Sequence, residues 1–406
     1  MINMHSCNLC KSNDLLQLIK FGHFPIMKHY LKSKNESRPT FPMNLYICKS
    51  CGLTQLVDSC PSKLLYDNYV TLSSWKSQPQ IQNEIDLLMS LEGMSKDSKI
   101  FEIGCNDGVF FDRFAANGFT NFIGIEPTID SYNIAKSKGY SVINDYLNVE
   151  TAESIKEQHG KFDLLMARHV LEHISDLPNM IKSIDILLCD NGYILIEVPN
   201  FERCLQSYNY ALWEEHVNYF TFATMKHYLS QIGISIIHEE SIVFSGEAIF
   251  VIGRKTNDIK TDFSYLNSLL KANLNYAEKW PAFKNTVLDF FRSEKEKGKK
   301  VAVYGAGSST FCLLSFLGLA PYIDLILDDQ QEKQDMFSPD SKLPIVSGEE
   351  LYKSGIDVCF LAVNVENEHK VISKHQKWVD GGGTFWSLIP PSDLLPPFWK
   401  NFIILD

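Results

Sequence analysis

Residues 99–117 read KIFEIGCNDGVFFDRFAAN, and the fold of the chain can be worked out from this stretch. Its first part, KIFEIG, is an apolar run with β-branched and aromatic residues, which predicts a buried strand. A glycine-bearing turn, CNDG, leads into an amphipathic helix predicted from Val109 to Asn117. A strand, a glycine turn and a helix N-terminus together form a cradle in which a ligand can approach bare backbone.

The alternation of strands and helices continues after this unit. From about residue 80 to residue 255, strand-like runs alternate with amphipathic segments, which is the pattern of a parallel α/β sheet. The next strands are predicted at 121–127, 141–144, 162–167 and 192–199, and a terminal β-hairpin at 235–242 and 247–254. A second α/β unit follows a mostly polar helical stretch, and its strands are predicted at 299–307, 323–329 and 357–363.

This pattern also predicts the domain organisation. Residues 1–70 carry cysteines and turns but no long periodic stretch, so we expect a small module there. Residues 71–256 are predicted to form the first α/β domain. Residues 257–406 are predicted to form a helical connector and a second, Rossmann-like domain. The predicted fold class is therefore α/β, with a Rossmann-like middle domain flanked by the two other parts.

The composition excludes several classes of protein. The chain has 406 residues, of which 45% are hydrophobic and 21% are charged, so it can bury sizeable cores. Disordered, collagen-like and disulfide-stapled small proteins are excluded. The formal net charge is −11, from 38 Lys and Arg against 49 Asp and Glu. We expect no nucleic-acid partner, because neutralising phosphates over a wide surface requires clustered cations.

The hydropathy pattern argues against a membrane location. No apolar run reaches the roughly 18–20 residues that a membrane-spanning helix needs, and the first residues lack the apolar core of a signal peptide. We therefore expect a cytoplasmic protein. In that compartment the ten cysteines are expected to be thiols or metal ligands rather than disulfides.

Four of the cysteines form two Cys-x-x-Cys pairs, Cys7 with Cys10 and Cys48 with Cys51. Two such turns place four thiolates at the corners of a tetrahedron, which suits Zn²⁺. A site with four cysteine ligands is coordinatively closed, so the predicted zinc is structural. A redox pair is the competing interpretation, but one Cys-x-x-Cys would suffice for that. The other six cysteines lie mostly within apolar runs and are expected in the core.

Acidic residues follow three consecutive predicted strands of the middle domain. The glycine turn has the form E-x-G-x-x-x-G, with Glu102 ending the strand, and differs from the dinucleotide-binding G-x-G-x-x-G. This form resembles motif I of class I methyltransferases that use S-adenosylmethionine. In that arrangement Glu126, at the end of the next strand, can accept both ribose hydroxyls, and Asp145 can receive the adenine amino group. Acidic residues at strand ends are often helix caps, but their order favours the cofactor. The expected cofactor-binding residues are Glu102, Gly104, Asn106, Gly108, Glu126, Asp145 and His169.

Two histidine-bearing segments follow the fourth and fifth predicted strands. The string HVLEH at 169–173 matches the inverted zinc-protease motif H-x-x-E-H, which would need a helix and a third ligand. Its place at the edge of the cofactor pocket instead favours His173 facing the substrate, whereas His169 could equally be a packed histidine. In the second segment His216 is a candidate general base, with Glu215 orienting its ring. A structural histidine that pins the loop is the alternative.

The C-terminal block contains a second glycine turn, Gly305-Ala306-Gly307, after a predicted strand. The third glycine of the dinucleotide fingerprint is missing, because Thr310 stands in its place. The turn is expected either to bind a nucleotide portion of the substrate or to pack against the middle domain.

The order of these parts resembles the sugar C-methyltransferase family, over nearly the whole chain. Those enzymes methylate nucleotide-linked deoxysugars, usually at the carbon beside a ketone. The residues that carry the resemblance are the four cysteines, YICKSCGLTQL at 46–56, Tyr69 with Ser73 and Ser74, EIGCNDG at 102–108, GIEP at 124–127, HISD at 173–176, Glu215 and His216 with Tyr219 and Phe220, and GAG at 305–307.

Several positions depart from the family pattern. Trp213 and Glu214 stand where the family carries Tyr-His, and Arg168 and His169 replace its Asn-rich stretch. Residues 244–249 read FSGEAI where the family has His-Gly-Gly-Ser-Leu-Arg. Its Lys after the second glycine turn is here Ser308 or Ser309. These differences lie in the part of the sequence expected to meet the substrate.

The resemblance implies an S-adenosylmethionine-dependent C-methyltransferase that acts on a nucleotide-linked 4-keto deoxysugar. His216 would remove the proton beside the ketone, and His173 would stabilise the developing enolate oxygen. O-methylation of a sugar hydroxyl or another small acceptor stays open, because Trp213 replaces the family tyrosine. The expected assembly is a monomer or a small homo-oligomer. A non-catalytic zinc module for nucleic acid is disfavoured by the acidic charge.

Overall fold

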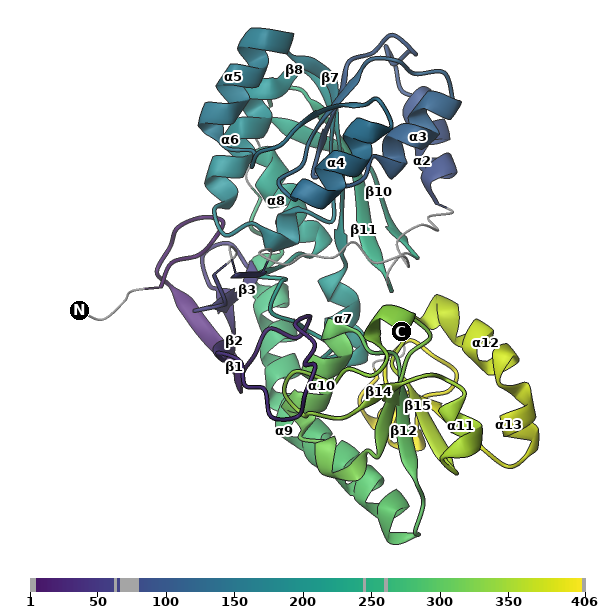
Figure 1. Cartoon of the computed structure of the whole chain (residues 1–406). Helices are drawn as coiled ribbons and strands as arrows, with labels where there is room; N and C mark the ends of the chain where they lie inside the picture. Colours follow the sequence, from purple (N-terminus) through teal and green to yellow (C-terminus); the bar gives the residue numbers. More distant parts are fainter. Residues whose placement is uncertain (1–4, 62–63, 66–79, 244–245, 259–261, 404–406) are drawn as a thin grey trace.

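The structure is a computed structural model that describes residues 5–61, 64–65, 80–243, 246–258 and 262–403. Tyr69, Ser73, Ser74, Phe244 and Ser245, which the family comparison above singled out, lie outside the described residues. Within the described ranges the strands form a four-stranded, a seven-stranded and a five-stranded sheet (Figure 1).

The four-stranded sheet is antiparallel and combines N-terminal strands with one strand from the middle of the chain. Its order is β1 (Leu15–Phe24), β2 (Phe41–Cys48), β3 (Thr54–Val57) and β9 (Asn218–Tyr219). In the last pair Thr54 lies opposite Tyr219 and Gln55 lies opposite Asn218. His216, the predicted general base, lies just before β9. The loop that carries it is therefore attached to the N-terminal sheet.

The seven-stranded sheet has the order β10-β11-β8-β7-β4-β5-β6. Five parallel strands form its body, and β11 runs antiparallel to both β8 and β10. The predicted strands and the terminal hairpin are confirmed. The strands are β4 (Ile100–Ile103), β5 (Phe122–Ile125), β6 (Ser141–Ile143), β7 (Phe162–Arg168), β8 (Leu188–Pro199), β10 (Ile234–Ile242) and β11 (Ala248–Lys255).

Helices cover both faces of this sheet (Figure 1). Apolar side chains of α2 and α3 pack on one face, and those of α5, α6 and α8 pack on the other. The strand order reverses at β4, with β5 on one side and β7 on the other, and ligands bind at the carboxyl ends of strands at such a point. The helices are α2 (Ile81–Met89), α3 (Val109–Ala116), α4 (Ile129–Ser137), α5 (Val149–His159), α6 (Leu177–Leu187), α7 (Phe201–Ser207) and α8 (Phe222–Ser230), with the 3-10 turn η2 (Leu171–His173).

The five-stranded sheet is fully parallel, with the order β14-β13-β12-β15-β16. The three inner strands were predicted from their apolar runs, but the two outer strands were not. The strands are β12 (Val301–Tyr304), β13 (Leu325–Leu327), β14 (Ile345–Val346), β15 (Val358–Leu361) and β16 (Thr384–Ser387). The helices are α10 (Ser308–Leu317), α11 (Glu350–Lys353), α12 (Val365–Lys374) and α13 (Gln376–Asp380), with 3-10 turns η3 (Ala320–Tyr322), η4 (Gln331–Lys333) and η5 (Pro397–Asn401).

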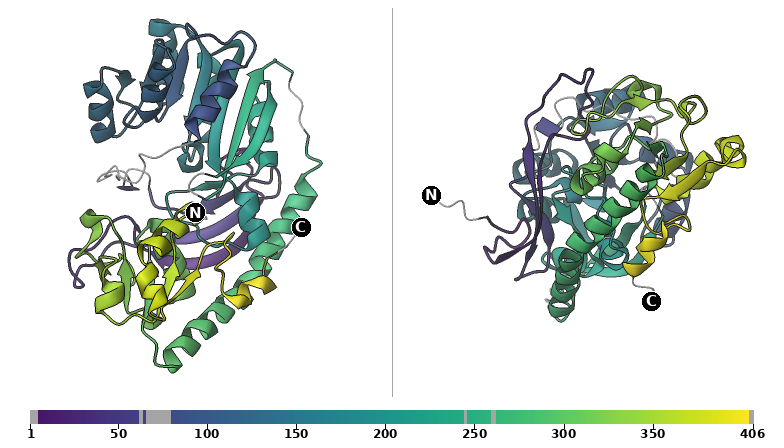
Figure 2. Two further views of the ribbon diagram at one scale, coloured as in Figure 1. Left: turned by 90° about the vertical axis from the view of Figure 1, so that its right-hand side faces the viewer. Right: turned by 90° about the horizontal axis from the view of Figure 1, so that it is seen from below.

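The long helix α9 (Leu266–Glu296) joins the parts (Figure 2). Its buried side chains share one core with strands of the N-terminal sheet, with Tyr210 of the middle domain and with the C-terminal sheet. Although α9 has 31 residues, neither it nor another helix in the described part of the chain is long and apolar enough to cross a membrane.

The contribution of this shared core to stability can be tested at Phe283 of α9. It is 0% exposed, and its ring centroid lies 5.0 Å from that of Tyr210 and 4.9 Å from that of Trp399. We expect Phe283→Ala to lower the free energy of unfolding by about 3–5 kcal/mol, because it leaves a cavity between the parts. Chemical denaturation measures this. The exposed Lys279→Ala on the same helix is the control, and equal effects of the two variants would contradict the prediction.

Candidate functional site

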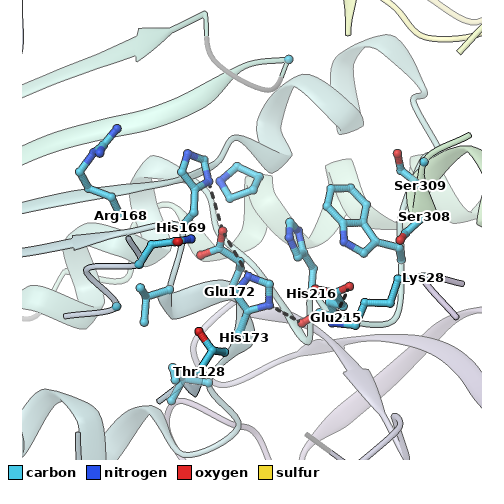
Figure 3. A pocket seen from close by; sticks show the side chains of 18 of the residues that line it. Lys28, Thr128, Arg168, His169, Glu172, His173, Glu215, His216, Ser308 and Ser309 are labelled. Carbon is cyan, nitrogen blue, oxygen red and sulfur yellow. Dashed lines mark hydrogen bonds and ion pairs between the residues drawn. The ribbon is translucent and has the colours of Figure 1, made fainter. Parts of the chain in front are cut away.

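A cavity of about 1670 Å³ lies at the carboxyl ends of the seven-stranded sheet (Figure 3). Residues of the N-terminal part, the middle domain and the C-terminal domain line it together. Among the predicted catalytic and cofactor-binding residues, those that line the cavity are Glu102, Gly104, Asn106, Glu126, Asp145, His169, His173, Glu215 and His216. Gly108 is the exception and has another role.

The two glycines of the first turn are needed for its shape. Gly104 has φ +70°, and a Cβ there would lie 2.7 Å from Cγ2 of Val170. Gly108 has φ +78° and is the N-cap of α3. A Cβ on Gly108 would lie 2.7 Å from the ring of Tyr140. Gly108 therefore shapes the helix start and does not face the cavity.

Glu126 and Asp145 lie where the sequence predicted, after β5 and β6. Glu126 is buried and accepts hydrogen bonds from the Asn106 N–H at 2.9 Å, the Thr128 N–H at 2.8 Å and the Thr128 hydroxyl. A carboxylate has about four acceptor positions, so Glu126 keeps capacity for roughly one further donor. Asp145 is exposed to the cavity and accepts from the Tyr146 N–H at 2.7 Å.

Glu102 is the buried carboxyl group at the base of this cradle. It is 3% exposed, and its Oε2 accepts no hydrogen bond from the described residues. Burial raises the pKa of Glu102 to about 8, and the charges of Glu126 and Glu84 act in the same direction against Arg168. An unpartnered buried acceptor beside an open glycine turn fits a ligand with a cationic ammonium group.

Arg168 connects Glu102 to a wider cluster of buried charges. Its Nε lies 2.7 Å from Glu197 and 3.7 Å from Glu84, and its guanidinium stacks over Phe110 at 4.3 Å. Burial opposes ionisation of Glu197, but Arg168 and His169 outweigh it and lower its pKa to about 2. Sequence reasoning missed Glu84 and Glu197, although Glu197 is the lone acidic residue of the apolar run YILIEVP.

His169 is a member of this charge cluster. Its Nδ1 lies 3.3 Å from Glu172 and its Nε2 lies 3.3 Å from Glu197, with the backbone at φ +52°. Burial opposes the charge, but the two carboxylates raise the pKa of His169 to about 9. The packed-histidine alternative therefore describes its contacts, although the ring also borders the cavity.

His173 and His216 lie side by side deeper in the cavity (Figure 3). Their ring centroids are 4.9 Å apart and the rings are perpendicular. Nδ1 of His173 donates to the backbone oxygen of Glu215 at 2.9 Å. His216 is 6% exposed, and the Trp213 ring lies against it at 3.8 Å. Burial, together with His173 and His169, holds the pKa of His216 well below its ordinary value, so this ring is neutral at pH 7.

The acidic residues beside His216 contact the flanking parts of the chain. The Glu215 carboxylate forms an ion pair with Lys28 Nζ at 3.2 Å, and its orienting of the His216 ring stays a prediction. Glu214 is buried, accepts from the Met27 N–H at 2.7 Å and contacts Cys312 Sγ at 3.4 Å. Burial raises the pKa of Glu214 to about 7. The loop that carries His216 is thus anchored to the N-terminal part and to the C-terminal domain. No feature of the sequence indicated a role for Lys28.

The second glycine turn, Gly305-Ala306-Gly307 of the C-terminal domain, also borders this cavity. Its Ala306 N–H donates to Asp328 at 2.8 Å, and its Ala306 oxygen accepts from Tyr30 at 2.8 Å. Ser308 and Ser309, at the N-terminus of α10, line the cavity. The turn therefore packs against the N-terminal part and also faces the site.

The four predicted metal-ligating cysteines come together. Cys7 Sγ lies 3.6 Å from Cys51 Sγ, and Cys10 Sγ lies 3.5 Å from Cys48 Sγ. All four sulfur atoms lie within 4.8 Å of one another. A tetrahedron with Zn–S bonds of about 2.3 Å has edges of roughly 3.8 Å, so the four thiolates fit one zinc ion.

Comparison with known families supports this arrangement. A zinc binding domain matches residues 7–66, a methyltransferase domain matches residues 78–239, and a C-methyltransferase C-terminal domain matches residues 267–390. The chain therefore has the domain set of a C-methyltransferase with an N-terminal zinc module. The expected fold class and the cofactors, S-adenosylmethionine and zinc, are thereby confirmed.

Individual relatives of this chain are distant. The ubiquinone biosynthesis O-methyltransferase of Pelagibacter ubique is 29% identical over 119 residues, which is 29% of this chain and 48% of the relative. That of Acinetobacter baylyi is 26% identical over 117 residues, 28% of this chain and 48% of the relative. The chain spans about half the length of these curated relatives.

Solved structures of methyltransferases also resemble the chain. An S-adenosylmethionine-dependent methyltransferase from Anabaena variabilis has 17% identity and a TM-score of 0.36, covering 48% of this chain and 90% of that one. The magnesium protoporphyrin IX methyltransferase from Synechocystis, solved with bound S-adenosylmethionine, has 14% identity and a TM-score of 0.34, covering 46% and 86%.

The zinc site can be tested by replacing one ligand. We expect Cys48→Ser to reduce the zinc content from about one ion per chain to near zero, because three thiolates hold zinc far less tightly. Elemental analysis after dialysis against a weak chelator measures this. Cys189→Ser, outside the cluster, is the control and should keep the metal. Full zinc retention by Cys48→Ser would contradict the assignment.

The raised pKa of Glu102 predicts that the protein releases a proton when the cofactor binds. With a pKa of about 8, its carboxyl group is mostly protonated at pH 7 in the free protein. A cationic cofactor group nearby favours the ionised form, so binding should release about one proton and strengthen as the pH rises toward 8. Calorimetry in buffers of different ionisation enthalpy measures the release. Glu102→Gln should lose this release, and the same release in both proteins would refute the prediction.

Proposed function

We propose that this protein is an S-adenosylmethionine-dependent C-methyltransferase that acts on a nucleotide-linked 4-keto deoxysugar. The observation that carries the proposal is one continuous cavity, which joins the first glycine turn, the two histidines and the N-terminus of α10. Its volume of about 1670 Å³ exceeds the roughly 300–1,000 Å³ of a site for one small ligand. A cofactor and a substrate of comparable size would fit together.

The cofactor is proposed to bind at the middle domain. Its amino group would lie toward Glu102, its ribose toward Glu126 and its adenine toward Asp145, with Gly104 and Asn106 supplying open backbone. When bound, S-adenosylmethionine supplies an electrophilic methyl group on a positively charged sulfur. The remaining steps depend on side chains of this chain.

The nucleotide portion of the substrate is proposed to bind at the C-terminal domain. Ser308 and Ser309 begin α10, and a helix N-terminus favours phosphate groups. Lys28 and Lys333 also line the cavity, paired with Glu215 and Asp328, and a diphosphate could exchange with these carboxylates for the two ammonium groups. This placement would direct the sugar toward the histidines.

His216 is proposed to remove the proton beside the ketone. Its low pKa leaves the ring neutral at pH 7, with a lone pair available to accept that proton. His173 is proposed to donate a hydrogen bond to the developing enolate oxygen. Because Nδ1 of His173 contacts the backbone oxygen of Glu215, Nε2 is the ring nitrogen that would face the enolate oxygen.

O-methylation of a hydroxyl is the second candidate. It is favoured by Trp213, which lies against His216 where the resembling family has a tyrosine. The O-methyltransferases among the relatives point the same way. In this case His216 would deprotonate a hydroxyl instead of a carbon.

The experiment offers methyl-labelled S-adenosylmethionine and a panel of nucleotide 4-keto-6-deoxysugars to the zinc-loaded protein in deuterated water. We expect methyl transfer with loss of one ring C–H, and deuterium exchange at that carbon without cofactor. Carbon NMR separates a C-methyl from an O-methyl product. His216→Ala should reduce exchange and transfer by about 10²- to 10⁴-fold.

The matched control is His238→Ala, on β10 and away from the cavity, which should retain full activity. Cofactor binding without transfer to any ketosugar, but with transfer to a hydroxyl acceptor, would reject C-methylation in favour of the second candidate.

A further inference from the structure

Glu172, His173 and His216 form a second cluster of metal-ligating side chains inside the cavity. One ligand atom from each lies within 4.8 Å of the other two. The cluster is separate from the four cysteines, and it lies among the groups proposed above for proton transfer. Two residues come from η2, and the third comes from the loop before β9.

The spacing is close to that of a metal centre. Nε2 of His173 lies 4.0 Å from Oε1 of Glu172, and the two imidazole centroids are 4.9 Å apart. Ligands around one tetrahedral transition-metal ion at bond lengths of about 2.0–2.2 Å lie about 3.3–3.6 Å apart. Small side-chain rotations, of roughly half an ångström to one ångström at the ligand atoms, would close the difference.

The neighbouring contacts already orient two of these ligands. A backbone oxygen can only accept, so the contact of His173 Nδ1 with Glu215 O places the donated proton on Nδ1 and the lone pair on Nε2. This arrangement orients metal-bound histidines in general. Lys28 holds Glu215 in turn, and the Glu172 carboxylate is held from the other side by His169 at 3.3 Å (Figure 3).

The backbone beneath the ligands is also fixed. The Asn218 side chain donates to the backbone oxygens of Leu171 and Ile174, at 2.9 Å and 2.7 Å. The Val217 N–H donates to the backbone oxygen of Glu172 at 2.8 Å. The loop that carries His216 is therefore tied directly to the turn that carries the other two ligands.

Buried charges of both signs surround the cluster. Glu172 is 1% exposed, and its Oε1 lies 3.3 Å from His169 Nδ1 and 4.0 Å from His173 Nε2. Glu84 and Glu197 lie against Arg168, and Glu197 also contacts His169. Arg168 and His169 already balance part of the negative charge, so the ion would be held by the three ligand atoms rather than by an excess of negative charge.

We propose that Glu172, His173 and His216 bind a divalent transition-metal ion, such as Zn²⁺ or Co²⁺, and that this ion blocks methyl transfer. Two imidazoles and one carboxylate are a ligand set for such ions, and the cavity leaves further positions open to solvent. The blocking effect rests on the proposed function, because a His216 nitrogen bound to metal has no lone pair for a proton. The site is thus an inhibitory one that competes with the substrate.

The test titrates the full-length protein, already holding its cysteine-bound zinc, with Co²⁺ alone. We expect about one further metal ion per chain by elemental analysis. Its visible d–d bands should appear without the thiolate-to-cobalt charge-transfer band of a cysteine site. Binding only at the cysteines, or no binding, would overturn the proposal.

Three single variants assign the ligands. Glu172→Gln, His173→Ala and His216→Ala should each weaken the second ion at least about tenfold. Retention of the cysteine-bound zinc shows that each variant is folded. His238→Ala, which removes a histidine that contacts Glu240 at 3.2 Å on strand β10, is the control and should bind Co²⁺ as the wild type does. Unchanged Co²⁺ binding in all three cluster variants would refute the site.

The metal stoichiometry is measured without substrate, so it does not depend on the proposed activity. If no acceptor is methylated but the second ion binds, the proposed function fails and the metal site stands. If methyl transfer occurs, the second ion should abolish it, and a chelator too weak to remove the cysteine-bound zinc should restore it. A rate that rises with the second ion would overturn the inhibitory assignment.

Discussion

The short pairing of β9 with β3 holds the candidate site together. Only two residues of β9 pair with β3, but Val217 extends the contact, since its oxygen accepts from the Leu56 N–H at 2.9 Å and its N–H donates to the Glu172 oxygen. One residue thus connects the N-terminal sheet to the turn that carries His173. The zinc cysteines Cys48 and Cys51 bracket the turn between β2 and β3, so the metal fixes the strand on which the loop of His216 depends. A zinc ion at these cysteines would therefore also hold the backbone that leads to His216.

The second constraint is the buried charge on Arg168. A guanidinium taken out of water is tolerated only when carboxylates surround it, and Glu197 satisfies this at 2.7 Å. Glu197 also contacts His169, which in turn contacts Glu172, so one chain of ion pairs runs from the sheet to the histidine turn. Glu102 lies beside this chain without a hydrogen bond of its own to Oε2 among the described residues. Glu102 is thus a buried carboxyl group that lies outside this chain of ion pairs, next to the first glycine turn.

Local patterns made much of this structure predictable. The apolar run before Gly104 and the paired cysteines are features of short segments, so the parallel sheets and the four-cysteine cluster could be inferred without long-range information. The pairing of Lys28 with Glu215 could not, because the two residues are far apart in the sequence and neither belongs to a motif. The two-residue strand β9 carries no periodicity at all. Most of what was missed consists of contacts between elements distant in sequence, such as Lys28 with Glu215 and Arg168 with Glu84, together with the short outer strands β14 and β16.

The environment of His216 limits how this ring could act as the proposed base. Burial keeps its ring neutral, which makes it able to accept a proton but also makes it a weak base. The nearby carboxylate of Glu215, which could have strengthened it, is engaged by Lys28 instead. A weak base can be effective only if the reacting groups are closely aligned, and alignment can contribute more to the rate than basicity does. The loop is anchored by Glu214 to Met27 and Cys312 on one side and by Asn218 to η2 on the other, which would supply the alignment that the proposed base needs. The contacts of this loop hold His216 in place, and they do not raise its basicity.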